Sequence, residues 1–235
     1  MRTLAIDTST MVMGVAILEQ DRVLGEMVTN LKKNHSVRLM PAVSQLLSEL
    51  DLSVSNIDQI AVTNGPGSYT GIRIGVTTAK TLSWAARLPL YSASSLTVLA
   101  HNAAHFPGLI VPLFDARRSR VYAGVYRRLI DQLEPVIRPQ VIHIEQLIKK
   151  VVSLNEPVLF LGEDVEIHRL NIEASFSSRL YFGQGGENIP HPSHLGLIAW
   201  RKHLDNEPPE TDDFAPDYLQ LTEAEAKWLQ KNRRD

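Results

Sequence analysis

The sequence predicts an α/β fold built from two related domains. Short apolar strands alternate with amphipathic helical stretches along 235 residues, a length that suits one large domain or two small ones. A strand, an aspartate-headed turn and a glycine-containing return strand occur twice, about 108 residues apart. The two copies contain Ile6-Asp7 with Gly14-Val15, and Phe114-Asp115 with Gly124-Val125. Such a repeat indicates duplicated domains.

Composition is typical of a globular protein, with 44% hydrophobic and 21% charged residues. The net charge of −2 provides no bulk attraction to nucleic acid, so an RNA role would need a local patch or a partner. Cysteine is absent, which excludes disulfides, thiolate metal sites and a cysteine nucleophile. The N-terminus lacks the apolar core of a signal peptide, and no apolar run approaches the roughly 20 residues of a membrane helix. We therefore expect a cytoplasmic protein that does not enter a membrane.

The first 50 residues predict three strands, over 3–6, 12–18 and 23–29, followed by a helix over about 36–50. Pro41 falls within the first turns of that helix. The helix therefore either kinks at Pro41 or starts there, where proline is tolerated.

A glycine-rich stretch, residues 64–75, joins a strand over 60–63 to a long helix over about 70–88. Its glycines allow positive φ or close backbone approach, and Ser68 and Thr70 are candidate N-caps. Amides at such a junction can bind an anion, but five residues separate Gly65 from Gly71 and no lysine follows, unlike a nucleotide P-loop. The stretch is therefore either an anion contact or a tight turn that binds nothing.

The turn after the first strand carries a carboxylate and three hydroxyl groups. These could approach a phosphate or a metal-bound water, or they could satisfy the backbone of the turn. The candidate nucleotide- or anion-contacting residues of the two segments are Asp7, Thr8, Ser9, Gly65, Gly67, Ser68 and Thr70.

The helix over 70–88 has a face of small residues, with Gly71, Gly75, Ala79 and Ser83 four positions apart. Arg73, Lys80 and Arg87 lie on roughly the opposite face. Gly75 lowers helix propensity by about 1 kcal/mol relative to alanine. A small-residue face kept at that cost predicts close approach of another helix, from the same chain or from another subunit.

The second half predicts strands over 109–114, 121–126 and 158–161 and helices over 145–152 and 192–204. Three arginines in the turn between the first two strands, Arg117, Arg118 and Arg120, either contact RNA phosphates or form a solvated, ion-paired hairpin. His101 and His105 have the spacing of two metal ligands, but no third ligand stands nearby in the sequence, so we expect no metal. The predicted domains are 1–105 and 106–213, with a C-terminal segment, 214–235, that ends in a helix over 222–234.

Several motifs occur along the chain: Leu4-Ala-Ile-Asp-Thr-Ser9, His35-Ser36 with Leu39-Met-Pro41, Gly65-Pro-Gly-Ser-Tyr-Thr-Gly-Ile-Arg-Ile-Gly75, Asp115-Ala-Arg117 with Val121-Tyr122, and Pro216-Asp-Tyr-Leu219. Together they resemble the TsaB (YeaZ) family of bacterial tRNA threonylcarbamoyladenosine biosynthesis proteins, which are similar to TsaD. The family belongs to the actin, sugar-kinase and heat-shock ATPase superfamily. The resemblance implies two actin-like (ribonuclease H-like) domains with mixed central sheets flanked by helices, the second smaller or degenerate.

The resemblance also implies a function. The chain would be a non-catalytic subunit that binds and activates TsaD, which threonylcarbamoylates the adenosine next to the anticodon of tRNAs reading A-starting codons. Its partners would be TsaD, the ATPase TsaE and a second copy of itself through the same surface, with tRNA reached indirectly. No cofactor is implied, and a nucleotide would bind only at a partner interface. The expected interface lies on the first two helices: Leu39, Met40, Val43, Leu46, Leu47, Gly71, Ile72, Gly75, Val76, Ala79 and Ser83.

An alternative is an enzyme of the same superfamily, either an ATP-dependent small-molecule kinase or a metallopeptidase-like protein. The turn that begins at Asp7 motivates it. However, the His-x-x-x-His metal pair of TsaD-like proteins would fall near residues 95–99, where this sequence has no histidine. We therefore expect no catalytic residues and no metal in this chain alone.

Overall fold

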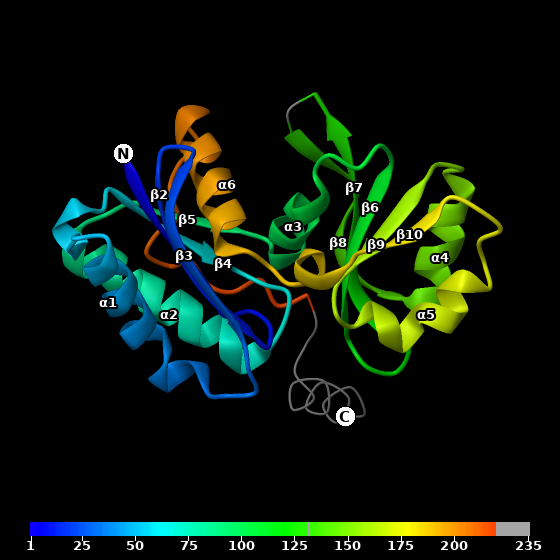
Figure 1. Ribbon diagram of the computed structural model, residues 1–235, viewed down its shortest axis with the longest axis horizontal. Coiled ribbons are helices and arrows are strands. Elements are labelled where there is room, and N and C mark those ends of the chain that lie inside the picture. The colour runs from blue at the N-terminus through cyan, green and yellow to red at the C-terminus, as the bar shows by residue number, and fades with distance from the viewer. Residues whose placement is uncertain (131, 220–235) are drawn as a thin grey trace, which may run out of the picture.

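The computed structural model, described here for residues 1–130 and 132–219, has two lobes that each contain a five-stranded mixed sheet flanked by helices (Figure 1). The strand orders are β3-β2-β1-β4-β5 and, read in the matching direction, β8-β7-β6-β9-β10. Each strand of one sheet thus has a counterpart in the other. The predicted duplication and the actin-like fold class are confirmed.

The first sheet begins with an antiparallel meander of β1 (Arg2–Asp7), β2 (Val12–Glu19) and β3 (Arg22–Asn30). Strands β4 (Gln59–Thr63) and β5 (Leu90–Ala93) extend it in parallel with β1. Helix α1 (Leu39–Glu49) follows a short 3-10 turn, and α2 (Tyr69–Ala86) follows the glycine-rich stretch. Pro41 lies in the first turn of α1, where its missing N–H removes no helical hydrogen bond.

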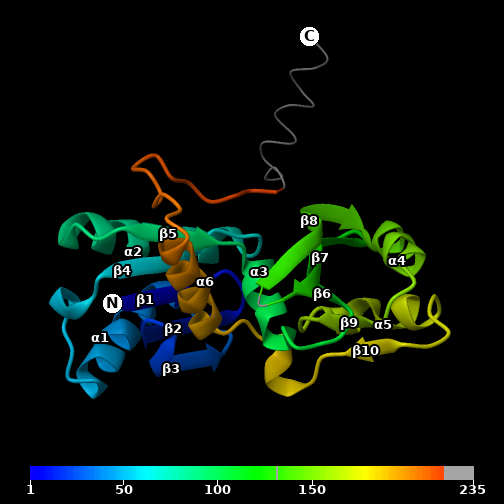
Figure 2. The ribbon, with the colours of Figure 1, turned by 90° about the horizontal axis from the view of Figure 1, so that it is seen from above.

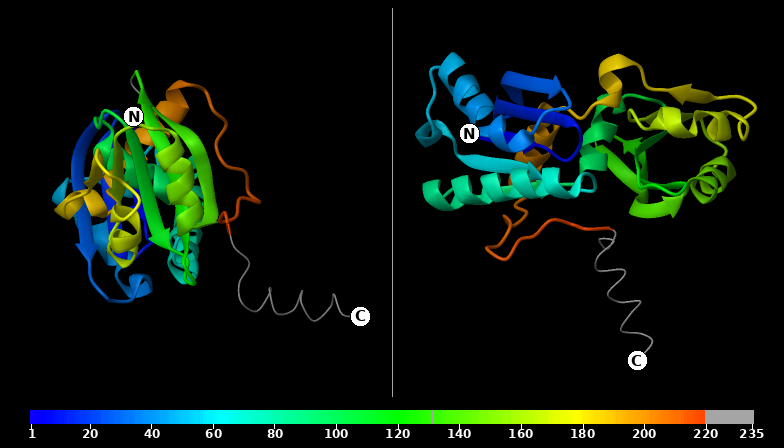
Figure 3. Two further views of the ribbon diagram at one scale, coloured as in Figure 1. Left: turned by 90° about the vertical axis from the view of Figure 1, so that its right-hand side faces the viewer. Right: turned by 90° about the horizontal axis from the view of Figure 1, so that it is seen from below.

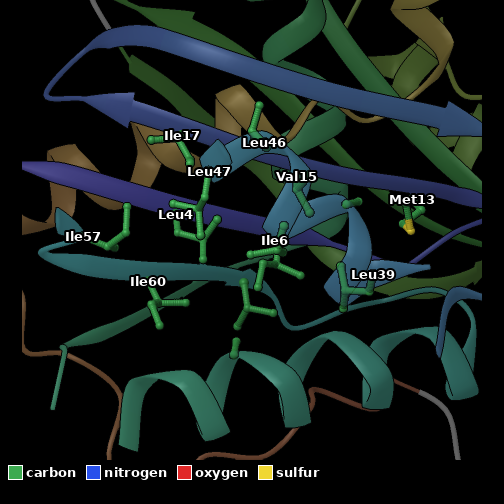
Figure 4. Close-up of a cluster of buried hydrophobic side chains, with 14 of the residues drawn as sticks. Leu4, Ile6, Met13, Val15, Ile17, Leu39, Leu46, Leu47, Ile57 and Ile60 are labelled. Carbon is green, nitrogen blue, oxygen red and sulfur yellow. The ribbon is translucent and has the colours of Figure 1, made fainter. Parts of the chain in front are cut away.

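Helices α1 and α2 cover one face of this sheet, and α6 (Pro192–Leu204) covers the other (Figure 1). Alternate residues of a strand point to opposite faces. Leu4 and Ile6 of β1 therefore join the core under α1 and α2 (Figure 4), while Ala5 packs beneath Leu195 and Ala199 of α6.

The second sheet contains β6 (Leu109–Asp115), β7 (Arg120–Leu129), β8 (Gln132–His143), β9 (Val158–Leu161) and β10 (Leu180–Phe182). Helices α4 (Ile144–Ser153) and α5 (Val165–Glu173) pack on one face of it. The sequence did not predict β8, α5 or β10. Strand β8 contains Pro135 and Pro139, and proline in a sequence argues against a strand. However, β8 lies at the edge of the sheet, where one side of the strand makes no hydrogen bonds to a neighbouring strand, so proline is tolerated there.

Two helices each pack on the lobe opposite to the one in which the predicted domain boundaries place them. Helix α3 (Ser95–Ala100) lies against β6 and β7 of the second sheet, whereas α6 contacts β1 and β2 of the first. The domain boundaries 1–105 and 106–213 therefore do not follow the packing, because α3 is buried against strands that follow it and α6 against strands at the start of the chain.

Residues 205–219, here called the C-terminal strap, run from α6 back across β5 and α2 (Figures 2 and 3). Glu210 donates its backbone N–H to Leu90, and Asp217 donates to Asn64. The predicted helix over 222–234 lies outside the described residues. Among the helices that are described, none is long and apolar enough to cross a membrane.

Candidate functional site

The candidate site is a cleft of about 480 Å³ between the two lobes. Both aspartate-headed turns contribute to its walls. From the first lobe it is lined by Ser9, Thr10, Met11, Leu31, Lys32, Lys33, His35, Gly67 and Ser68, and from the second by Phe114, Asp115, Tyr122, Glu163, Asp164, Asn188 and Pro190.

Asp7, at the end of β1, is completely buried and organises the first turn. Its Oδ1 accepts hydrogen bonds from the Ser9 N–H (2.9 Å), the Ser9 hydroxyl (2.7 Å) and the Thr63 hydroxyl (2.8 Å). Burial raises the pKa of Asp7, against the opposing effect of these bonds. Asp7 thus satisfies groups of the turn, one of the two roles left open by the sequence, and it does not itself line the cleft.

The glycine-rich stretch lies directly on this turn. Ser68 donates its N–H to the Ser9 carbonyl (2.7 Å), and the Thr8 hydroxyl donates to the Gly71 carbonyl (2.7 Å). A Cβ on Gly67 would stand 2.0 Å from the Ser9 carbonyl oxygen, and one on Gly71 would stand 2.1 Å from that of Thr8. Glycine is therefore required for the close approach of two backbones.

Ser68 caps α2 as predicted, because its side chain accepts a hydrogen bond from the Gly71 N–H. Thr70 lies in the first turn of the helix and is exposed. Of the candidate anion-contacting residues, Ser9, Gly67 and Ser68 line the cleft, whereas Asp7, Thr8 and Gly65 are buried behind them. The structure brings the two segments together and uses most of their polar groups for hydrogen bonds within the lobe.

The small-residue face of α2 packs on its own lobe. Gly75 faces the side chain of Thr8, where a Cβ would stand 2.5 Å from the hydroxyl oxygen, and Ala79 is fully buried in the first core. The close approach therefore involves the turn and the sheet of the same chain rather than another helix.

This packing buries most of the residues of the expected interface. Nine of its eleven residues are buried within the lobe: Leu39, Val43, Leu46, Leu47, Gly71, Ile72, Gly75, Val76 and Ala79. Ser83 is half-buried and donates its hydroxyl to Leu88, so only Met40 is exposed. The apolar face of an amphipathic helix covers its own sheet, and residues chosen by that periodicity are therefore the ones a partner cannot touch.

The outer face of the same helices instead exposes large side chains, of which only Met40 belongs to the expected interface. Val37 is 68% exposed, Met40 44%, Tyr69 41% and Trp84 81%. Val37 belongs to the 3-10 turn that lies beside α2. Helical periodicity could have indicated Tyr69 and Trp84, because both fall outside the repeating buried positions of α2.

The cationic face of α2 holds the C-terminal strap. The Lys80 ammonium donates to the carbonyls of Asp212 (2.8 Å) and Phe214 (2.6 Å). The Arg73 guanidinium lies 4.3 Å from the ring centre of Tyr69 and donates to the Tyr218 hydroxyl (2.8 Å). The Tyr69 and Tyr218 rings are 5.1 Å apart.

In the second lobe the corresponding turn is open. Asp115 keeps 27% of its side chain exposed, its N–H donates to Asp164 (2.8 Å), and its Oδ1 lies 3.4 Å from His168 Nε2. The three residues after Ala116 adopt left-handed φ values of 62°, 54° and 56°. Arg117 and Arg118 are exposed, and Arg120 is half-buried.

The histidines at 101 and 105 have different partners. His101 Nδ1 lies 2.9 Å from the Thr97 carbonyl, and its ring faces that of His194 at 6.0 Å, whereas His105 contacts Arg128. Burial, together with the nearby His101 and His191, lowers the pKa of His194 to about 4. No group of three His, Cys, Asp or Glu residues suited to a metal is found in the described part of the chain.

The family model described as TsaD, tRNA N6-adenosine threonylcarbamoyltransferase, matches residues 22–228. The chain is also 44% identical, over 233 residues, to the tRNA threonylcarbamoyladenosine biosynthesis protein TsaB of Bacillus subtilis, covering 99% of this chain and 100% of that protein. The chain belongs to the TsaB family. Escherichia coli TsaB is 33% identical over 151 residues, which cover 61% of this chain and 65% of that protein. The structure of YeaZ from Pseudomonas aeruginosa superposes with a TM-score of 0.75 at 26% identity, covering 93% of this chain and 99% of that one.

Proposed function

We propose that this TsaB-family chain is a non-catalytic subunit that binds TsaD and activates it. The reaction it supports would be threonylcarbamoylation of the adenosine next to the anticodon of tRNAs reading A-starting codons. Membership of the TsaB family supports the role in tRNA threonylcarbamoyladenosine biosynthesis. The ATPase TsaE would complete the complex, in the cytoplasm, and the chain alone would pair with itself through the surface that TsaD uses.

The observation that carries this proposal is the outer surface of α1 and α2. Val37, Met40, Tyr69 and Trp84 place large apolar groups in solvent along this one helical layer. Aromatic residues and methionine are enriched in protein interfaces and dominate their binding energy. The buried residues of both helices would act indirectly, because they fix the position of this surface on the first sheet.

The role of Asp7 supports a non-catalytic subunit. Its carboxylate is buried, and one of its oxygens holds the first turn through three hydrogen bonds. A general base or a metal ligand must reach its substrate or ion, and Asp7 stands behind the cleft lining rather than in it.

The cleft itself favours the enzyme alternative, because it lies between two actin-like lobes and is bordered by the N-terminus of α2. Calorimetry of the isolated chain with ATP and Mg²⁺, or with Zn²⁺, tests that alternative. Binding below millimolar ligand would support a kinase or metallopeptidase-like activity, and its absence would remove it.

The main test is a charge placed on the outer surface. In the Val37→Glu/Met40→Glu double variant, two ionised carboxylates would have to be buried in the contact, so we expect at least tenfold weaker association with TsaD in size-exclusion chromatography and calorimetry. Leu204→Glu is the matched control, since Leu204 is 56% exposed at the end of α6, on the opposite face of the sheet. Reconstituted tRNA modification should fall in parallel with TsaD binding.

Wild-type affinity in a correctly folded Val37→Glu/Met40→Glu variant would disprove the interface. Failure of the wild-type chain itself to bind TsaD or to stimulate modification would disprove the function.

A further inference from the structure

We propose that cationic side chains on both lips of the interlobe cleft hold the phosphate backbone of tRNA. They are Lys32, Lys33, Arg117, Arg118 and Arg120. The inference rests on the proposed function, in which tRNA is the macromolecule brought to the complex, and it changes the role of the chain from an indirect to a direct contact with RNA.

The two groups of cations border the same opening. Lys32 and Lys33, in the connection from β3 to α1, line the cleft. Across it, Asp115 lines the cleft at the base of the arginine turn between β6 and β7. The end of β3 is held against the second lobe, because the Asn30 side chain donates to Glu163 (2.7 Å). In Figure 1 the β3–α1 connection runs along the lower edge of the first lobe.

Around this opening, five cationic residues (Lys32, Lys33 and the three arginines of the turn) accompany three lining carboxylates, so cations outnumber acidic groups. Within the described residues, the Lys32 and Lys33 ammonium groups have no ion-pair or hydrogen-bond partner. The acidic groups of the cleft do have partners: Glu163 accepts from Asn30, Asp164 accepts from the Asp115 N–H, and Asp115 lies beside His168. A chain with a net charge of −2 thus has a local basic patch, which is the form of RNA site its composition permits.

The fold does not require arginines in this turn. The counterpart of this turn in the first lobe joins the equivalent strands, β1 and β2, through Thr8, Ser9, Thr10 and Met11, and contains no cation. The arginine turn also contains three consecutive left-handed residues, a conformation that is unfavourable by roughly 1 kcal/mol for each non-glycine residue. Hydrogen bonds from Ile144 to Ser119 and from Arg120 to Arg117 hold it. Strain maintained by the surroundings is typical of functional segments, and a rigid turn loses little entropy on binding.

The position of the arginines favours an extended polyanion over a small one. Arg117, Arg118 and Arg120 follow the lining residue Asp115 but do not line the cleft themselves, whereas a small phosphorylated ligand would sit among the lining residues. A nucleic-acid backbone repeats its charge every few ångströms and can contact the arginine turn and the lysines together. We therefore assign the surface to RNA and keep a nucleotide in the cleft as the competing outcome.

The proposal is tested by fluorescence anisotropy of labelled tRNA at several KCl concentrations. The tRNA is titrated with the complex of this chain and TsaD, and separately with the chain alone. The variants are Arg117→Glu/Arg118→Glu and Lys32→Glu/Lys33→Glu. The control is Lys149→Glu/Lys150→Glu on the exposed side of α4, which changes the net charge by the same amount. We expect each cleft variant to bind tRNA at least tenfold more weakly in 0.1 M salt, and the control to stay within twofold of wild type. The slope of log K against log salt should fall by about 0.7 to 0.9 for each phosphate that the variant no longer neutralises.

Three results would overturn the inference while leaving TsaD binding intact. They are an equal loss of tRNA affinity in the control, an unchanged salt slope in both cleft variants, or cleft variants that lose ATP binding but keep tRNA affinity. Urea unfolding midpoints within 0.3 M of wild type, on the order of the ordinary scatter of such measurements, confirm that the variants are folded. If wild-type chain fails to bind TsaD but the cleft variants still lose tRNA affinity in the chain alone, the proposed function fails and the RNA surface stands.

Discussion

The two aspartate-headed turns occupy equivalent places in the duplicated sheets, yet one is buried and the other is open. The turn at Asp7 lies under α2, and its aspartate has no exposed surface. The turn at Asp115 keeps a quarter of its aspartate exposed and continues into exposed arginines. Equivalent topology therefore does not give equivalent chemistry, because the residues of the turn and of the helix beside it decide what reaches solvent.

The difference comes from how closely each following helix approaches its turn. In the first lobe, Gly67 and Gly71 let α2 lie against the turn backbone. In the second lobe, Gly162 makes a similar approach to Leu113, which precedes Asp115 in the strand rather than following it in the turn, and Asp164 then contacts Asp115 through its side chain. The second helix therefore leaves its turn uncovered.

The largest expected effect is the loss of the close approach in the first lobe. Gly71→Ala should lower the free energy of unfolding by roughly 3 kcal/mol, because the clash with the Thr8 carbonyl outweighs a helix-propensity gain of about 1 kcal/mol. Urea unfolding measures the change. Thr77→Ala, at an exposed position of α2, is the control and should alter stability by less than about 0.5 kcal/mol. Equal stability of the two variants would mean that the turn is not held by α2.

The next largest effect is the pH dependence of stability caused by His194. This residue lies where α6 of the first lobe meets α3 of the second, so its protonation should destabilise both lobes if they unfold together. Burial holds the pKa of His194 at about 4, below its ordinary value of 6.5, so the unfolded chain binds the proton more readily. Stability from this residue is complete above pH 6.5 and is lost as the pH falls toward 4, by roughly 3 kcal/mol.

His194→Gln should therefore reduce the loss of stability between pH 6.5 and pH 4, measured by urea unfolding with probes in each lobe. The groups facing His194 are His101, His191 and Glu26, and they remain in the variant. If the loss of stability between pH 6.5 and pH 4 is the same in the variant as in wild type, the loss arises from His101, His191 and Glu26 instead.

A smaller effect concerns the buried carboxylate of the first turn. Burial raises the pKa of Asp7, so the native state holds its proton more tightly than the unfolded state does. The contribution of Asp7 is most favourable below pH 3.8 and declines as the pH rises through the raised pKa. The side chain in Asp7→Asn stays neutral at every pH. The stability of this variant relative to wild type should therefore increase as the pH rises through the raised pKa of Asp7. The measurement is thermal unfolding from pH 3 to 8, and a constant difference across this range would contradict the burial of a titrating group.

The smallest effect concerns backbone strain in the second turn. Ser119→Gly relieves a left-handed residue but loosens the unfolded chain, so stability should rise by about 0.5 kcal/mol or less. Ser9→Gly in the first turn is the contrasting change, because it removes a hydroxyl bonded to Asp7 and should lower stability by about 1 kcal/mol or more. A comparable response of both turns to glycine would remove the distinction between them.

Much of the fold and part of the site follow from local patterns in the sequence. The first three strands, α1, α2, the N-cap at Ser68 and the repeat of the Asp turns were all predicted. The packing of the glycine-rich stretch on the Asp7 turn was not, although both segments were named as candidates for one contact. The interface residues were chosen by apolar and small-residue periodicity, and that signal marks the side of a helix that its own sheet buries.

By itself, the sequence determined the elements and their repeat, because strand alternation, helical period and turn chemistry act between residues close in the chain. Only the tertiary structure decided that α3 and α6 pack on opposite lobes, that the strap binds Arg73 and Lys80, and that one Asp turn is buried while the other stays open. The burial of the first turn and the binding of the strap depend on contacts between residues more than 50 positions apart, and α3 packs on the two strands that follow it; no local pattern records the geometry of either kind of contact.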